Sequence, residues 1–397
     1  MPSGLGELDR VLGGGFVPGS VVLLGGEPGV GKSTLALQIA ARIDAAARQA
    51  GEGSRSVLYI SGEESPEQIR LRAERLEEDS SGVAILAETR VESFANAWKE
   101  LAPRLVVIDS IQTLQTSRVE SSPGSVSQVR ESASLLAATA KLHTTTLILV
   151  GHVTKDGTIA GPRVLEHLVD VVLNFEGDRN HAFRLLRASK NRFGSTQEVG
   201  VFTMAEQGLV EVENPSELFL AEHRDGAPGS CIIPLLEGSR PLLIEIQALV
   251  ATATYGTPRR TSIGIDDSRV ALILAVLDQR TPVDLVSRDV YVNVTGGVRV
   301  GEPAADLGLA LAIASSALDI ALPAGAAAVG EIGLGGEVRR VARLDLRIRE
   351  LGRLGFRQLL VPPGTRAAVK SSTCELIEVD NIANVISWLR ESAGPRP

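Results

Sequence analysis

The octapeptide Gly26-Glu-Pro-Gly-Val-Gly-Lys-Ser33 decides the fold of the first half of this chain. It follows the apolar segment Val21–Leu24 and precedes a helical segment that begins near Lys32, so it fits the P-loop pattern in full. Glycines in such a loop let successive backbone N–H groups point at a phosphate chain, and the helix that follows adds the positive end of its dipole. The pattern predicts a phosphate-binding loop between a strand and a helix.

The loop also predicts roles for its side chains in binding ATP and Mg²⁺. Lys32 is expected to reach the β- and γ-phosphates and to be needed for catalysis, and the Ser33 hydroxyl is expected to ligate the metal. The residues expected to contact ATP are Gly26, Glu27, Pro28, Gly29, Val30, Gly31, Lys32, Ser33 and Thr34.

A second motif places a carboxylate at the end of an apolar strand. Leu105–Asp109 has the Walker B arrangement, in which Asp109 holds the metal through Ser33 or a water. Many buried strands end in an aspartate that caps a helix, so the motif alone is weak. Together with the P-loop, it predicts Asp109 as a metal ligand.

Two adjacent carboxylates, Glu63 and Glu64, follow the strand that contains Tyr59. In an open α/β sheet, ligands bind outside the carboxyl ends of the strands, so a carboxylate there can polarise the water that attacks the γ-phosphate. Capping of the helix after Pro66 is the alternative role. Both residues are candidate catalytic groups, and we favour Glu63 for the water.

Outward from these motifs, the first half alternates strand-like and helix-like segments, a pattern typical of a parallel sheet with helices on both faces. The strand-like segments are Val21–Leu24, Val57–Ile60, Leu105–Asp109 and Thr146–Val150, and the helical ones are Ser33–Ala50, Pro66–Glu78, Val91–Leu101 and Val126–Leu142. The closely spaced segments Val171–Phe175, Ala182–Ala188 and Val199–Thr203 predict an antiparallel extension of the sheet.

The second half predicts a separate α+β domain. At 397 residues the chain is too long for one core, and the turn-rich stretch from Val210 to Gly229 marks the expected boundary, with domains over residues 1–215 and 216–397. The expected strands are Leu242–Thr252, Thr261–Ile265, Val290–Val294 and Gln358–Val361, the helices Arg269–Asp278, Ala304–Leu318, Leu344–Leu354 and Ile382–Glu391, and a Gly-rich hairpin spans Ala326–Val341.

The composition is that of a globular protein, with 44% hydrophobic and 22% charged residues. No apolar run reaches the roughly 20 residues needed to cross a bilayer, so no membrane partner is expected. The two cysteines, Cys231 and Cys374, are too few for a disulfide framework or a zinc site and suit a reducing cytosol. The net charge of −8 does not exclude nucleic-acid binding, which depends on local patches.

The motifs of the first half resemble the RecA superfamily, and Lys190-Asn-Arg-Phe-Gly194 resembles the signature pentapeptide of the RadA (Sms) family of bacterial recombination proteins. The opening Ser3–Gly15 and the segment Tyr59–Ser65 are similar to that family as well. Members usually begin with a four-cysteine zinc-binding module, whereas no cysteine precedes Cys231 here, which implies a trimmed or shortened chain without a zinc site. The resemblance implies an α/β RecA-type P-loop ATPase core followed by an α+β Lon-protease-like domain.

In the Lon-like half, the resemblance implies that the peptidase chemistry is lost. Active Lon uses a serine–lysine pair, and Ala304 stands where the serine is expected, within Gly301–Asp306. An ungapped count from Gly330-Glu-Ile332 places the lysine at Asp345. Alanine has no oxygen to acylate. The resemblance implies that this domain instead holds a ring together and touches DNA.

Three further residues are expected to act around the nucleotide. Lys190 and Arg192 follow the strand Ala182–Ala188, from where RecA-like proteins reach a neighbouring subunit's nucleotide, as an arginine finger does. A solvated basic turn is the alternative reading of that stretch. His152 follows the strand that ends at Val150, where RecA-like folds keep a γ-phosphate sensor, and a structural histidine is the alternative.

Two basic stretches are candidate DNA contacts. The loop from Thr154 to Arg163, with Lys155, occupies the place of the first DNA-binding loop of RecA, and a surface loop without function is the alternative. Seven arginines lie between residues 339 and 357, among them Arg339, Arg340 and Arg343. This stretch is either a DNA track or a helix with one solvated face.

Taken together, these features favour a DNA-dependent ATPase that forms a ring, expected to be hexameric, and translocates on single-stranded DNA. Its expected partners are single-stranded and branched DNA and a RecA-type recombinase, in the cytoplasm at the nucleoid, where it would promote branch migration in homologous recombination and repair. The alternatives are an ATP-dependent Lon-type protease, which Ala304 and Asp345 oppose, and a KaiC-like signalling ATPase, which would carry two such cores where this chain has one P-loop.

Overall fold

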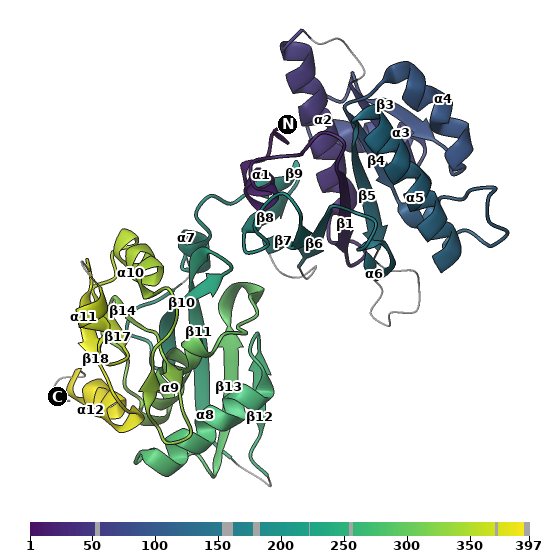
Figure 1. Ribbon diagram of the computed structural model, residues 1–397. Helices are drawn as coiled ribbons and strands as arrows, with labels where there is room; N and C mark the ends of the chain where they lie inside the picture. The colour runs from purple at the N-terminus through teal and green to yellow at the C-terminus, as the bar shows by residue number, and fades with distance from the viewer. Residues whose placement is uncertain are drawn as a thin grey trace. The chain divides into compact units, whose positions relative to one another are not determined.

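The computed structural model describes residues 1–51, 56–152, 162–177, 183–221, 223–253, 257–369 and 372–392 (Figure 1). The chain divides into two compact units, Met1–Glu213 and Asn214–Pro397. Each of them has a sheet of its own. Among the described helices, none is long and apolar enough to span a membrane.

The described part of the first unit contains a nine-stranded sheet in the order β3-β2-β4-β5-β1-β6-β7-β8-β9. Neighbours from β3 to β6 pair in parallel, and β7, β8 and β9 extend the sheet in antiparallel fashion. The strands are β1 (Val21–Gly26), β2 (Val57–Ser61), β3 (Ala84–Ala87), β4 (Leu105–Asp109), β5 (Thr146–His152), β6 (Val171–Glu176), β7 (Phe183–Asn191), β8 (Val199–Ala205) and β9 (Gly208–Glu211).

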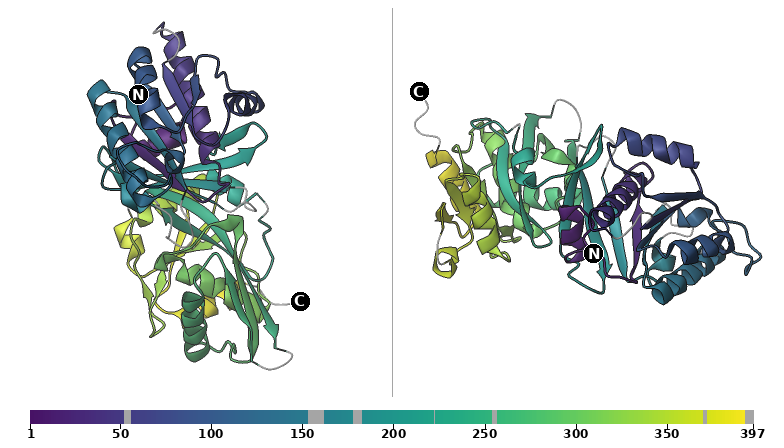
Figure 2. Two further views of the ribbon diagram at one scale, coloured as in Figure 1. Left: turned by 90° about the vertical axis from the view of Figure 1, so that its right-hand side faces the viewer. Right: turned by 90° about the horizontal axis from the view of Figure 1, so that it is seen from above.

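Helices cover both faces of this sheet. Successive side chains of a strand point to opposite faces, and in the central strands the side chains on both faces are apolar. Val22 and Leu24 of β1 belong to one core cluster, and Val21 and Leu23 belong to the other. The first cluster includes residues of α1 (Gly6–Leu12), α2 (Lys32–Gln49) and α3 (Pro66–Arg75), and the second includes residues of α4 (Val91–Leu101), α5 (Val126–His143) and α6 (Pro162–Leu165). Figure 2 shows the sheet between these helices from two further sides.

The predicted α/β class and the alternation of elements in this unit are confirmed, with differences in detail. The edge strand β3 was not predicted, because Ala84–Ala87 is short and half of it is alanine, which has little strand preference. The helix expected over Pro66–Glu78 ends at Arg75. The strand expected to end at Ala188 continues to Asn191, which places Lys190 inside β7 rather than after it.

The second unit contains, among its described residues, a seven-stranded sheet in the order β12-β13-β11-β10-β14-β17-β18 and the small hairpin β15-β16. The strands are β10 (Ser230–Glu237), β11 (Arg240–Thr252), β12 (Arg260–Ile263), β13 (Arg288–Val294), β14 (Ala326–Ala328), β15 (Glu331–Ile332), β16 (Val338–Arg339), β17 (Gln358–Val361) and β18 (Glu375–Glu378). The helices are α7 (Pro215–Phe219), α8 (Asp267–Arg280), α9 (Asp306–Leu318), α10 (Leu344–Arg353), α11 (Thr365–Ala368) and α12 (Ile382–Ser392).

This unit corrects the expected hairpin over Ala326–Val341. Its first residues form β14, which pairs in parallel with β10 and β17 inside the main sheet, and only β15 and β16 form a hairpin. Strand β10 was missed because Pro234 interrupts its apolar run, although its neighbours in the strand pair regularly with β11. The turn-rich boundary also contains the end of β9 and the short helix α7.

Candidate nucleotide site

The P-loop lies between the end of β1 at Gly26 and the start of α2 at Lys32. A Cβ atom on Gly26 would lie 2.4 Å from the carbonyl oxygen of Phe175, so this position leaves no space for a side chain. Gly31 has φ +112°, a conformation that other residues rarely adopt. Glu27, Pro28 and Gly29 form the exposed part of the loop, Val30 is buried, and Ser33 and Thr34 lie in the first turn of α2.

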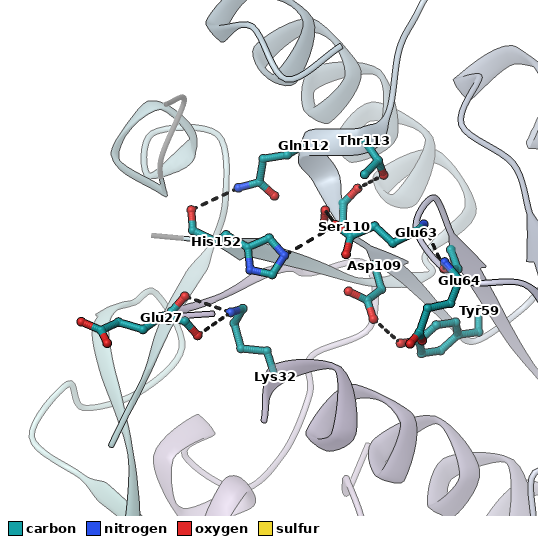
Figure 3. A network of polar contacts seen from close by, with 12 residues as sticks. Glu27, Lys32, Tyr59, Glu63, Glu64, Asp109, Ser110, Gln112, Thr113 and His152 are labelled. Carbon is teal, nitrogen blue, oxygen red and sulfur yellow. Dashed lines mark hydrogen bonds and ion pairs between the residues drawn. The ribbon is translucent and has the colours of Figure 1, made fainter. Parts of the chain in front are cut away.

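The Lys32 ammonium is held inside this loop. Its Nζ donates hydrogen bonds of 2.9 Å to the carbonyl oxygens of Gly26 and Glu27, and the residue is 3% exposed. Burial lowers the pKa of Lys32 to about 8, against the opposing effect of the nearby carboxylates of Asp109 and Glu63. The ammonium and both carboxylates therefore belong to one site (Figure 3).

The register of the sheet explains why Asp109 lies beside the P-loop. Ser61 at the end of β2 pairs with Asp109 at the end of β4, and Asp109 pairs with Val150 of β5. Two residues further on, His152 pairs with Gly26 of the P-loop. The carboxyl ends of four parallel strands thus meet at one edge, where a doubly wound sheet binds its ligand.

Two hydroxyl groups, neither of them singled out from the sequence, contact the acidic residues of the site (Figure 3). The Tyr59 hydroxyl donates a 2.6 Å hydrogen bond to Oδ2 of Asp109. The Ser110 hydroxyl donates a 2.7 Å hydrogen bond to Oε1 of Glu63. A tyrosine inside an apolar strand is ordinarily a core residue, so no feature of the sequence indicated this contact. It arises because β2 lies beside β4 in the sheet.

Glu64 differs from Glu63 in its partner. Its carboxylate forms an ion pair with Arg72 of α3. The helix itself is capped by Ser65, which forms a capping box with Gln68. The alternative role for the acidic pair, capping of this helix, is therefore wrong. The structure places Glu63 toward Lys32 and leaves Glu64 bound to α3.

His152 lies next to Glu63 at the end of β5. Its Nε2 is 3.6 Å from Oε1 of Glu63, and its carbonyl oxygen accepts a 3.2 Å hydrogen bond from Nε2 of Gln112. Nδ1 of His152 is buried and has no hydrogen-bond partner among the described residues. The imidazole is therefore part of the polar site rather than of the apolar core, and its role as a sensor remains a prediction.

A cavity of about 610 Å³ lies beside Thr34. It is lined by α2, the end of α3 and the turn between β8 and β9, through Thr34, Arg75, Leu76, Glu77, Met204 and Gly208. A volume of this size holds a small organic ligand. Sequence reasoning did not find it, because its walls come from segments far apart in the chain.

Lys190 and Arg192 lie away from the P-loop of their own chain. Val172 of β6 pairs with Leu23 of β1 on one side and with Lys190 of β7 on the other. Lys190 is therefore two strands away from β1 and level with Leu23, three residues before the P-loop begins at Gly26. The Lys190 Nζ donates to the carbonyl oxygens of Glu166 and Val169 at 2.6 and 2.7 Å. Arg192 lies 3.3 Å from Asp170, with 56% of its side chain exposed.

The candidate DNA contacts differ in how they are held. Lys155 and most of the loop from Thr154 to Arg163 lie outside the described residues, and Arg163 belongs to α6 with an undescribed side chain. Arg339 pairs with the carboxylates of Glu331 and Glu337. The guanidinium groups of Arg340 and Arg343 are exposed, and within the described part of the chain they donate only to backbone carbonyls, those of Pro363 and Gly238.

The region around Ala304 contains a partly buried ion pair, between Arg347 and Glu302. Arg347, which is 1% exposed, donates to both carboxylate oxygens of Glu302 at 2.8 and 2.6 Å. Ala304 and Ile348 belong to the same core cluster. Asp345, where the ungapped count places the lysine, is 58% exposed and pairs with Arg349. Arg347 of the same helix is buried.

The P-loop, the parallel sheet and the carboxylates at its strand ends define a P-loop ATPase core of the RecA type. The DNA repair protein RadA of Bacillus subtilis (strain 168) is 50% identical over 390 residues, which cover 98% of this chain and 83% of that protein. RadA of Brucella abortus (strain 2308) is 50% identical over 396 residues, 98% of this chain and 83% of that protein. The chain belongs to the RadA family of DNA repair proteins and is a DNA repair ATPase.

The first half of the chain also matches a more general family. The family model described as an AAA domain matches residues 7–158. Among solved structures, a KaiC-like protein from Pyrococcus horikoshii has a TM-score of 0.43 at 23% identity, covering 53% of this chain and 98% of that one. A second solved structure, an ATPase domain, has a TM-score of 0.44 at 17% identity, covering 53% of this chain and 91% of that one.

Proposed function

We propose that this chain is a DNA-dependent ATPase that assembles as a hexameric ring and translocates on single-stranded DNA, promoting branch migration during recombinational repair. The observation that carries the proposal is the cluster of Lys32, Asp109 and Glu63 at one edge of the sheet. Membership of a DNA repair family supports the choice of DNA as the partner. A RecA-type recombinase is the partner protein that this role requires.

In the proposed site, Gly26 to Thr34 bind the phosphates of ATP, and the cavity beside Thr34 takes the nucleoside. Ser33 and Asp109 would hold Mg²⁺, since their hydroxyl and carboxylate oxygens are the donors that this ion prefers. When bound, the ion neutralises charge on the phosphate chain. Lys32 adds a second positive charge on the same side.

Glu63 acts as the general base in this proposal. The Ser110 hydroxyl orients the carboxylate through Oε1, so that Oε2 is available to accept a proton from the attacking water. His152 contacts the same Oε1 atom and would sense the γ-phosphate. Lys190 and Arg192 would supply positive charge to a neighbouring subunit, which suits their distance in the sheet from their own P-loop.

The second unit acts as a scaffold in this proposal, a Lon-protease-like domain over residues 216–397 without peptidase activity, next to an ATPase domain over residues 1–215. Ala304 cannot be acylated, and Arg347 is already bound to Glu302. Arg340 and Arg343 are better candidates for DNA contacts than Arg339, since no carboxylate pairs with them among the described residues. Lys155 and Arg163 remain candidates in the first unit.

A branch-migration assay tests this function. Purified protein with ATP and Mg²⁺ should convert a three-stranded DNA junction into product, and Glu63→Gln should bind the junction without converting it. Casein added to the same preparation should remain intact. Casein degradation would favour the Lon-type alternative, and ATP hydrolysis without any response to DNA would favour a KaiC-like signalling role.

A further inference from the structure

We propose that Tyr59 is a positioning residue of the magnesium site. Its hydroxyl determines which carboxylate oxygen of Asp109 faces the P-loop. This inference rests on the proposed use of Mg²⁺ with ATP. The Tyr59 hydroxyl donates a 2.6 Å hydrogen bond to Oδ2 of Asp109. Figure 3 shows the other carboxylate oxygen directed away from Tyr59, toward the side where Lys32 lies.

The backbone holds both partners of this hydrogen bond in place. Tyr59 lies in β2 and Asp109 at the end of β4, and these strands pair in parallel from Val57 to Ser61. Tyr59 is 1% exposed and Asp109 is 6% exposed, so water has little access to their contact. A buried tyrosine hydroxyl needs a partner, and here that partner is the proposed metal ligand itself.

The hydrogen bond has a consequence for metal binding. A carboxylate can rotate and present either oxygen to a metal, and a donor fixed on Oδ2 removes that freedom. Oδ1 is then oriented toward the P-loop before the ion arrives. Groups that orient metal ligands in this way typically change metal affinity by about 10–100-fold when they are removed.

The experiment compares Tyr59→Phe with wild type in a Mg²⁺ titration of nucleotide binding, with a fluorescent ADP analogue as the probe. The substitution removes one hydroxyl and keeps the ring in the core. We expect the Mg²⁺ concentration at half-saturation to rise about 10-fold, with binding in EDTA unchanged. Tyr291→Phe, in β13 of the second unit, is the matched control and should titrate like wild type.

A double-mutant cycle separates positioning from a general loss of structure. In an Asp109→Asn background, Tyr59→Phe should produce no further change in the Mg²⁺ titration, because the group through which it acts is gone. An equal effect in both backgrounds, or a Tyr59→Phe titration like that of wild type at a lowered unfolding temperature, would show that Tyr59 only supports the core. If wild type binds the nucleotide without any Mg²⁺ dependence, both the proposed magnesium site and the positioning role of Tyr59 are wrong.

Discussion

Glu63 and Glu64 are neighbours in the sequence, but the side chains that they contact give them different roles. Glu63 accepts a hydrogen bond from the Ser110 hydroxyl, which leaves its carboxylate at the nucleotide site. Glu64 forms an ion pair with Arg72, which holds it against α3. A residue held by a guanidinium two turns into a helix is badly placed to reach a water at the γ-phosphate.

Substitution of each glutamate tests this division. We expect Glu63→Gln to bind ATP normally and to lower the hydrolysis rate by about 10²–10⁴-fold, since an amide cannot take the proton of water. Glu64→Gln should keep most of the wild-type rate and lose only the Arg72 ion pair. Phosphate release and nucleotide affinity, measured on both variants, decide between them. The assignment is reversed if Glu64→Gln is the inactive variant.

The sequence predicted the P-loop, Asp109 and the acidic pair, because each of these motifs is local and follows a recognisable strand. It did not predict Tyr59, Ser110 or Arg72 as members of the site. Tyr59 reaches Asp109 because β2 and β4 are neighbours in the sheet. Arg72 reaches Glu64 because the first turns of α3 fold back beside it. These are tertiary relations, and spacing along the chain does not contain them.

At the scale of elements, the central strands and long helices were predictable from their apolar periodicity. Short elements such as β3 and β14 were not, since three or four residues are too few to show a period and alanine, which makes up half of β3 and all of β14, has little strand preference. The length of β7 was underestimated because Lys190 is a charged residue inside a strand. Its ammonium is satisfied there by two backbone carbonyls.

Helix α10 offers a test of the partly buried ion pair between Arg347 and Glu302. We expect Arg347→Met to destabilise the second unit by about 2 kcal/mol, because it removes two charge-assisted hydrogen bonds to Glu302. The exposed pair of Arg349 with Asp345 is the matched control, and Arg349→Met should cost less than about 1 kcal/mol.

Tryptophan fluorescence can follow this unfolding in the second unit alone. The chain has two tryptophans, Trp98 in α4 and Trp388 in α12, so urea unfolding in a Trp98→Phe background reports Trp388. Similar midpoints for Arg347→Met and Arg349→Met would mean that the Arg347–Glu302 pair contributes no more than a surface pair.

At the scale of the whole molecule, the separation of Lys190 and Arg192 from their own P-loop predicts an active site shared between subunits. Arg192→Ala should bind ATP like wild type and lose DNA-stimulated hydrolysis by on the order of 10³–10⁵-fold, as for other arginine fingers. Mixed with Lys32→Ala subunits it should recover activity, since one subunit supplies the cation and the other an intact P-loop. An inactive mixture, despite confirmed co-assembly, would remove the shared role.

Binding to DNA also depends on the charge of the whole molecule, which carries a net charge of −8. Arg339 and Arg353 are neutralised by neighbouring carboxylates, so the arginine-rich stretch is less basic as a surface than as a sequence. Binding to DNA phosphates should therefore depend on a few unpaired guanidinium groups and weaken with salt.

The most direct test of the central claim is the rate of phosphate release from ATP, measured with Mg²⁺ over a range of single-stranded DNA concentrations. We predict that the wild-type rate rises with DNA and saturates. Lys32→Ala should release no phosphate at any DNA concentration, because the P-loop has lost its buried cation. A Lys32→Ala variant that hydrolyses ATP like wild type, or a wild-type rate that DNA leaves unchanged, would contradict the account.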